Sequence, residues 1–132
     1  MAKPQHLNRL HEGVADWNKW VEANPYPQTV PDLSGAELQE MDLPRIDLRR
    51  PCLHGAHLNK ASLQGTNLWK ADLSQAELRG TDLGDSNLRK ANLFEAKLSH
   101  ADSRRANLTG ALFVDSELEQ VDLSGAFVYG CS

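Results

Sequence analysis

The sequence predicts a solenoid built from a five-residue repeat and preceded by a short amphipathic helix. Leucines recur at every fifth residue over most of the chain, and no insertion interrupts this spacing between residues 31 and 130. Residues 1–30 follow a helical spacing instead. A short fixed repeat is typical of solenoids, in which each unit packs against its neighbours and no unit is stable alone. The 132 residues suffice for one folded domain.

The N-terminal segment carries an apolar stripe with alternating spacings of three and four residues. The stripe consists of Leu7, Leu10, Val14, Trp17 and Val21. These residues lie on one helical face, which predicts a single helix from about Pro4 to Glu22, ended by the NPYP turn. Because an open solenoid end exposes unpaired backbone groups, we expect this helix to cover it. The alternative is a helix that binds a partner or a membrane surface.

The repeat occupies residues 31–130 as 20 consecutive units, from PDLSG to AFVYG. The third position is Leu in 17 units, the first is Ala, Ser or Thr in 15, and the second is usually Asp, Asn or Glu. We expect the third and first positions to face a narrow interior, where only a small residue fits beside each leucine. The second-position Asp and Asn side chains are expected to accept hydrogen bonds from turn amides.

This A(D/N)LXX pattern resembles the pentapeptide-repeat family over residues 31–130. The resemblance implies an all-β fold, a right-handed quadrilateral β-helix with four repeats per coil, and therefore about five coils. The W-N-x-W element at 17–20, followed by PDLSGA, is similar to the lead-in of cyanobacterial members with a helical cap. The expected organisation is a capping helix and linker at 1–30, the solenoid at 31–130 and a C-terminal tail at 131–132.

One inward position inside the solenoid departs from the pattern. Ser103 replaces the leucine between Leu83 and Leu123 of the same column. We expect a small void at this position and a hydroxyl group that requires a backbone acceptor.

The last coil is expected to present apolar side chains. They are Leu112, Phe113, Val114, Phe127, Val128 and Tyr129. An uncovered apolar end favours a homodimer through the C-terminal coil, which the family resemblance also implies. The alternative is that the aromatic side chains fold over the end. Phe94 and Val114, adjacent on one side of the rod, form a second candidate contact surface.

One face of the rod is basic if every fourth unit stacks. It carries Arg49, Arg50, Lys70, Arg89 and Lys90 against Asp47, with Trp69 in its middle. Such a strip can bind phosphates, and an indole can stack on a base. The alternative is an ordinary solvated face.

The resemblance also raises mimicry of DNA toward type II topoisomerases. An acidic stripe at Asp42, Asp82, Asp102 and Asp122, with Asp85, is the feature that would support it. The formal net charge of −4 is slight, however, and Arg104 and Arg105 lie beside the stripe. We therefore regard nucleic-acid-related roles as the less favoured class.

Motifs of enzymes and cofactor sites are missing from the sequence. It contains no P-loop, G-x-G-x-x-G, G-x-S-x-G or H-E-x-x-H, so we expect neither catalysis nor a cofactor. Cys52, His54 and His57 form the one cluster that resembles metal ligands, but a fourth ligand is missing and we expect no metal there.

No apolar run approaches the roughly 18 residues of a membrane span, and the two cysteines are compatible with a reducing compartment. The sequence therefore predicts a cytoplasmic, non-enzymatic scaffold for an unidentified protein partner.

Overall fold

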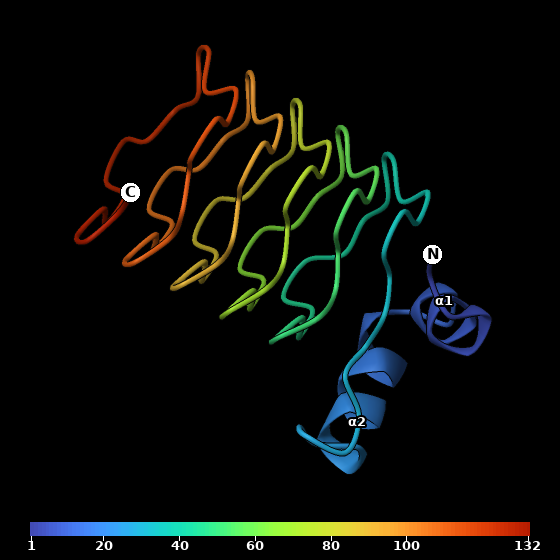
Figure 1. Cartoon of the computed structure of the whole chain (residues 1–132). Helices are drawn as coiled ribbons and strands as arrows, with labels where there is room; N and C mark the ends of the chain where they lie inside the picture. Colours follow the sequence, from blue (N-terminus) through green and yellow to red (C-terminus); the bar gives the residue numbers. More distant parts are fainter.

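The repeat forms a solenoid of five coils in the computed structural model, which describes all residues 1–132. Sixteen isolated parallel β-bridges join the second residue of a unit to the residue 20 positions later, from Asp32–Cys52 to Asn107–Phe127. Four units therefore make one coil, and the coils stack into a rod (Figure 1). Since only one residue of each unit forms a bridge, the sides of the coil are too short to form extended strands.

A tight turn separates each side of the coil from the next. The third residue of a unit accepts a hydrogen bond from the first residue of the following unit, as in Ala36 N–H to Leu33 O at 3.0 Å. The fifth residue has φ between 54° and 72° in all 20 units, and 13 of these residues are not glycine. Positive φ at the third residue of a four-residue turn is characteristic of type II turns. Each non-glycine residue in this conformation costs about 1 kcal/mol, which the packing of the rod offsets.

The second-position side chains hold these turns, as predicted. In ten units an Asp or Asn oxygen accepts a hydrogen bond from the backbone N–H two residues later, at 2.9–3.3 Å. Asp82 and Gly84 give the shortest example, at 2.9 Å. The prevalence of Asp and Asn at this position is therefore a requirement of the turn.

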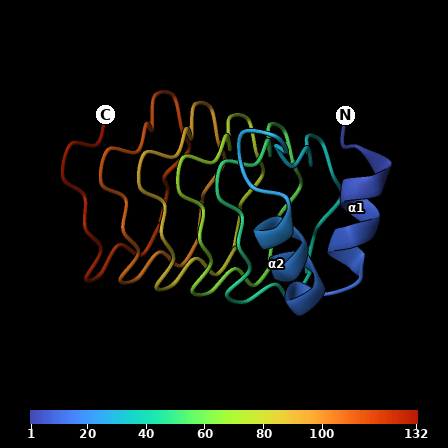
Figure 2. The ribbon, with the colours of Figure 1, turned by 90° about the horizontal axis from the view of Figure 1, so that it is seen from below.

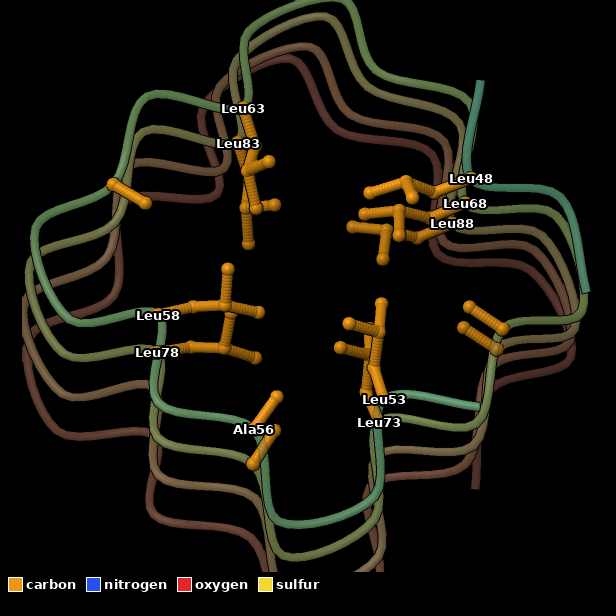
Figure 3. Packing of buried hydrophobic residues seen from close by; sticks show 14 of the residues in the cluster. Leu48, Leu53, Ala56, Leu58, Leu63, Leu68, Leu73, Leu78, Leu83 and Leu88 are labelled. Carbon is orange, nitrogen blue, oxygen red and sulfur yellow. The ribbon is translucent and has the colours of Figure 1, made fainter. Parts of the chain in front are cut away.

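The interior consists of four columns of inward leucines. Figure 3 shows one column at Leu48, Leu68 and Leu88, and leucines from the other sides pointing toward it. Third-position residues of the first four coils are buried, and so are the first-position residues except Met41. A buried first-position hydroxyl finds a backbone acceptor: Thr81 Oγ1 donates to Leu58 O at 2.8 Å.

The N-terminal segment forms two helices, so the prediction of a single helix was wrong. Helix α1 spans Pro4–His11 and helix α2 spans Val14–Ala23. The break falls at Gly13, whose φ of 115° is accessible to glycine and outside the helical range. The apolar stripe keeps its spacing across the break, and its members Leu10 and Trp17 are fully buried. Neither helix has the length and apolar character needed to cross a membrane.

Helix α1 covers the backbone of the first side of coil one (Figure 2). Lys3 N–H donates to Asp32 O at 3.0 Å, and Asp32 N–H donates to Nδ1 of the buried His6 at 2.9 Å. In later coils the corresponding groups pair with the preceding coil, as Cys52 N–H does with Pro31 O at 2.8 Å. Residues of the cap therefore take the place of a missing coil.

Helix α2 pairs in the same way with backbone groups on the fourth side of coil one. Trp17 Nε1–H donates to Asp47 O at 2.7 Å, and Asp47 N–H donates to Asn18 Oδ1 at 2.7 Å. On two of the four sides of coil one, residues of the N-terminal segment thus pair with backbone groups that an uncapped solenoid would leave free, as expected of a cap.

We predict that Ser103→Leu raises the melting temperature. Ser103 is buried in the inward column between Leu83 and Leu123, and a leucine there restores the apolar packing of the column. Thermal unfolding followed by circular dichroism measures the change. The control is Ser86→Leu, at a first position where the hydroxyl donates to Leu83 O and a larger side chain overpacks the interior, so its melting temperature falls. A lower melting temperature for Ser103→Leu would contradict the prediction.

We predict that the contribution of His6 to stability is lost in mild acid. Burial, assisted by Lys3, lowers the pKa of His6, while Asp32 opposes this effect. The unfolded chain therefore binds the proton more readily than the folded chain, and stability falls as the pH drops below about 6.5 toward the lower folded pKa. Protonated Nδ1 also cannot accept the Asp32 N–H.

Urea unfolding between about pH 7.5 and about pH 5 measures this effect. The difference in unfolding free energy between the native protein and His6→Gln should shrink as the pH falls, whereas His11→Gln, on the exposed face of α1, should show no such trend. A difference for His6→Gln that stays constant with pH would count against the assigned role.

Candidate functional site

A cavity of about 310 Å³ lies where the segment after α2 meets the fourth side of the solenoid. One wall comes from α2, the linker and the first residue of the solenoid: Val21, Glu22, Asn24, Pro25, Tyr26, Thr29 and Pro31. The other wall consists of Arg49, Arg50 and Trp69 from the first two coils. The predicted basic face therefore meets the only cavity found in the molecule.

The Arg50 guanidinium lies between two aromatic rings. Its Cζ atom is 4.2 Å from the centre of the Tyr26 ring and 4.6 Å from that of the Trp69 ring. Lys70 Nζ is 4.7 Å from the Trp69 ring centre. Cation–π contacts therefore orient both cations at the edge of the cavity. Tyr26 was missed by the sequence analysis, because it lies outside the repeat and only its place in the NPYP turn distinguishes it.

The predicted basic residues differ in how they are paired. Arg49 Nη2 lies 2.7 Å from Asp47 Oδ2, and this hydrogen bond raises the pKa of Arg49. Arg50, Lys70 and Lys90 have no carboxylate within 4.0 Å. Arg89 is exposed and directly precedes Lys90 in the same unit. The fourth side thus combines one locally neutralised arginine with several unneutralised cations.

Arg50, Lys70 and Lys90 form one column along the rod. The bridges Asp47–Asn67 and Asn67–Asn87 hold their units in register. We name these three residues the cation column. Repulsion by Arg50, followed by desolvation and by Lys90, lowers the pKa of Lys70.

The last coil exposes inward-facing positions at its open edge. Leu118 and Leu123 are each 43% exposed and Val128 is 52% exposed, although the equivalent residues of earlier coils are buried. Phe127 and Tyr129 are 57% and 80% exposed, so the aromatic side chains do not cover this edge. We name these five residues the open edge.

Backbone donors are also free at this edge. In inner coils the third-residue N–H donates to the next coil, as Leu98 N–H does to Glu117 O at 2.9 Å. The N–H groups of Leu118, Leu123 and Val128 have no backbone acceptor. The open edge therefore combines apolar side chains with unpaired hydrogen-bond donors.

Cys131 and Ser132, which we expected to form a tail, extend the repeat pattern. Ser132 N–H donates to Ala111 O, and Phe113 N–H donates to Ser132 O. The Cys131 thiol donates to Leu108 O at 2.8 Å, in the same way as the Ser116 hydroxyl donates to the carbonyl 23 residues earlier. These two residues thus cover part of the first side of the last coil.

Phe94 and Val114 form an apolar strip on the first side of the rod. They are 38% and 48% exposed. Glu95 N–H donates to Val114 O at 3.0 Å, which places the two units in adjacent coils. Because Val114 belongs to the last coil, the strip reaches the C-terminal end of the rod on the side that Cys131 and Ser132 partly cover.

The residues of the C-x-H-x-x-H cluster engage separate neighbours. His54 Nδ1 lies 2.9 Å from Ser74 Oγ, and His57 Nδ1 lies 3.7 Å from a Glu77 carboxylate oxygen. Cys52 is a half-buried free thiol. No group of three potential metal ligands converges here or elsewhere in the chain.

The acidic stripe is paired with arginines in part, at Asp102 and at the neighbouring Asp85. Arg104 Nη2 lies 2.7 Å from Asp102 Oδ2, and Arg105 Nε lies 2.9 Å from Asp85 Oδ1. These arginine hydrogen bonds are the main reason that the pKa values of Asp85 and Asp102 are lowered. These pairs reduce the free negative charge of the stripe, although Asp42 and Asp82 have no cationic partner within 4.0 Å.

Comparisons with known proteins agree with this architecture. A family model described as pentapeptide repeats matches residues 52–89 and 86–125. The search of curated proteins found no match.

Two solved structures from cyanobacteria are similar to the chain. The pentapeptide repeat protein alr5209 of Nostoc PCC 7120 is 31% identical, with a TM-score of 0.62, and the match covers 84% of this chain and 95% of that one. The pentapeptide repeat protein Rfr23 of Cyanothece 51142 is 32% identical, with a TM-score of 0.67. That match covers 68% of this chain and 62% of that one.

Both neighbours are right-handed β-helices. The family match spans more than half of the chain, and the matched residues lie within the second to fifth coils described above. The chain therefore belongs to the pentapeptide-repeat family.

Proposed function

We propose that this protein is a non-enzymatic scaffold for protein–protein interaction that binds through its open edge, and that a second copy of the chain is a partner. The observation that carries the proposal is the exposure of inward-type side chains at Leu118, Leu123 and Val128, beside N–H groups without acceptors. When another molecule covers exposed apolar surface and pairs with free backbone donors, the free energy of the system falls, so such a surface favours association.

The two ends of the rod differ in a way that favours a closed dimer. At the N-terminal edge, side chains of the cap accept hydrogen bonds from the backbone N–H groups of Asp32 and Asp47. A second rod therefore cannot stack there in register. Two open edges can face each other about a two-fold axis, which buries the same surface on both copies and leaves no site for further growth.

Acidic residues surround the open edge. They are Asp115, Glu117, Glu119 and Asp122. Arg79 lies 2.9 Å from Glu117, and Arg104 lies 3.9 Å from Asp122, so part of this charge is compensated within the chain. The remaining repulsion between two copies is screened by salt, and self-association is therefore expected to strengthen as the ionic strength rises.

The strip at Phe94 and Val114 extends the proposed contact surface onto the first side of the rod. It is available to a further protein partner when the open edge is occupied, because Phe94 lies one coil away from that edge. This arrangement supports a scaffold with an end surface and a side surface.

Mimicry of DNA toward topoisomerases receives less support than protein interaction. A mimic needs free negative charge along its surface, whereas Arg104 and Arg105 bind the carboxylates of Asp102 and Asp85. We therefore do not assign this role.

We predict that the 132-residue chain has twice its mass of 14.6 kDa in solution, measured by light scattering after gel filtration. Leu123→Glu should yield the single-chain mass, because it places a charge in the apolar contact. Gln64→Glu, which adds one negative charge to the same side of the rod far from the open edge, should remain dimeric. Circular dichroism confirms that both variants are folded. A single-chain mass for the unmodified protein at micromolar concentration and moderate salt would contradict self-pairing.

A further inference from the structure

We propose that the cavity at Tyr26 and Trp69, together with the cation column, binds a nucleoside polyphosphate. The phosphates lie along the cation column, and the base lies in the cavity. This site is at the opposite end of the rod from the open edge, so the inference is independent of the proposed function.

The cation column is the first observation. Four of the seven arginines of the solenoid, Arg49, Arg79, Arg104 and Arg105, lie within 4.0 Å of a carboxylate. Arg50, Lys70 and Lys90 have no such partner, although they are held in register by the bridges of their units. Coils separated by about 4.8 Å place the three cations along about 10 Å. Such a row suits a ligand with several linked negative charges.

The aromatic cavity is the second observation. Its 310 Å³ is at the lower end of the range for small-molecule sites. Tyr26 and Trp69 line the cavity with the Arg50 guanidinium between their rings, and a planar base can stack on the ring surface that Arg50 leaves uncovered. Asn24, Thr29 and Glu22 add polar groups to the lining, which can bond to base or ribose atoms. The cavity therefore offers contacts that an inorganic anion alone would not use.

The limits of the column favour a single nucleotide over a strand of nucleic acid. Gly110 follows Lys90 at the same turn position in the next coil, so the row of charges stops there. At the other end, the linker and Glu22 line the cavity, and Glu22 adds a negative charge instead of a further cation. A strand bound along its backbone needs a basic groove that continues past both limits.

A purely structural role does not account for the whole site. Arg50 fastens the linker to the solenoid through Tyr26, which explains its own position. Lys90 contacts neither the aromatic pair nor any carboxylate, and Lys70 reaches only Trp69. A cluster of like charges without a structural partner is expected where an anionic ligand supplies the compensation.

Binding of ATP to the 132-residue protein, in low-salt buffer without divalent cations, tests the proposal by isothermal titration calorimetry. ATP should bind at least about tenfold more tightly than adenosine, because the phosphates engage the cation column. It should also bind about fivefold more tightly than inorganic triphosphate, because the base enters the cavity. Raising the salt concentration should weaken binding. Equal affinities for ATP and inorganic triphosphate, or tighter binding of a ten-residue oligothymidylate than of ATP, would overturn the proposal.

Variants locate the binding site. Lys70→Gln and Lys90→Gln should each weaken ATP binding about threefold to tenfold, and Trp69→Leu should remove the preference for ATP over inorganic triphosphate. Lys60→Gln is the matched control, since Lys60 occupies the same turn position with φ of 60° on another side of the rod. Its affinity should be unchanged, and melting curves confirm the fold of each variant. An equal loss for Lys60→Gln and Lys70→Gln would overturn the assignment to the column.

Discussion

The backbone ladder between coils is the interaction on which the rest of the structure depends. The N–H group of the second residue of a unit donates to a carbonyl of the preceding coil, 21 residues earlier, as Asn67 N–H does to Ile46 O. The N–H groups of the third and fifth residues donate to a carbonyl of the following coil, 19 residues later, as Leu48 N–H does to Asn67 O. This register places each leucine over the leucine of the previous coil, and it equally places Arg50, Lys70 and Lys90 in line. The core and the surface pattern are thus consequences of one set of hydrogen bonds.

Much of this fold could be predicted from the sequence, because each inward position repeats at a constant spacing. Buried Leu, small first-position residues and the turn-holding Asp and Asn all follow from local repetition and from the narrowness of the interior. The number of units per coil did not follow from the spacing, since a period of five is compatible with several coil sizes. It came from the resemblance to a family. The break at Gly13 was missed because the apolar stripe of Leu10 and Trp17 stays in phase on both sides of it.

The candidate site was predictable only in part. Stacking every fourth unit was enough to bring Arg50, Lys70 and Trp69 together, because they belong to the repeat. The contact of Tyr26 with Arg50 joins a segment without repeats to the solenoid, and no spacing rule connects the two. The pairing of the acidic stripe was similarly hidden, since it depends on how the side chains of Arg104 and Arg105 bend toward their neighbours. Side-chain conformation, unlike register, is not encoded in a period.

The left-handed fifth residues have a consequence for how such a rod can change. The backbone strain at these corners is similar for Lys, Glu, Arg and Gln, since it arises from the Cβ atom that they share. Exchanging one of these side chains for another therefore alters the surface with little effect on folding. The fifth positions of successive coils therefore form rows of exposed sites about 4.8 Å apart. Their side chains can be substituted to change the surface chemistry while the backbone of the rod stays the same.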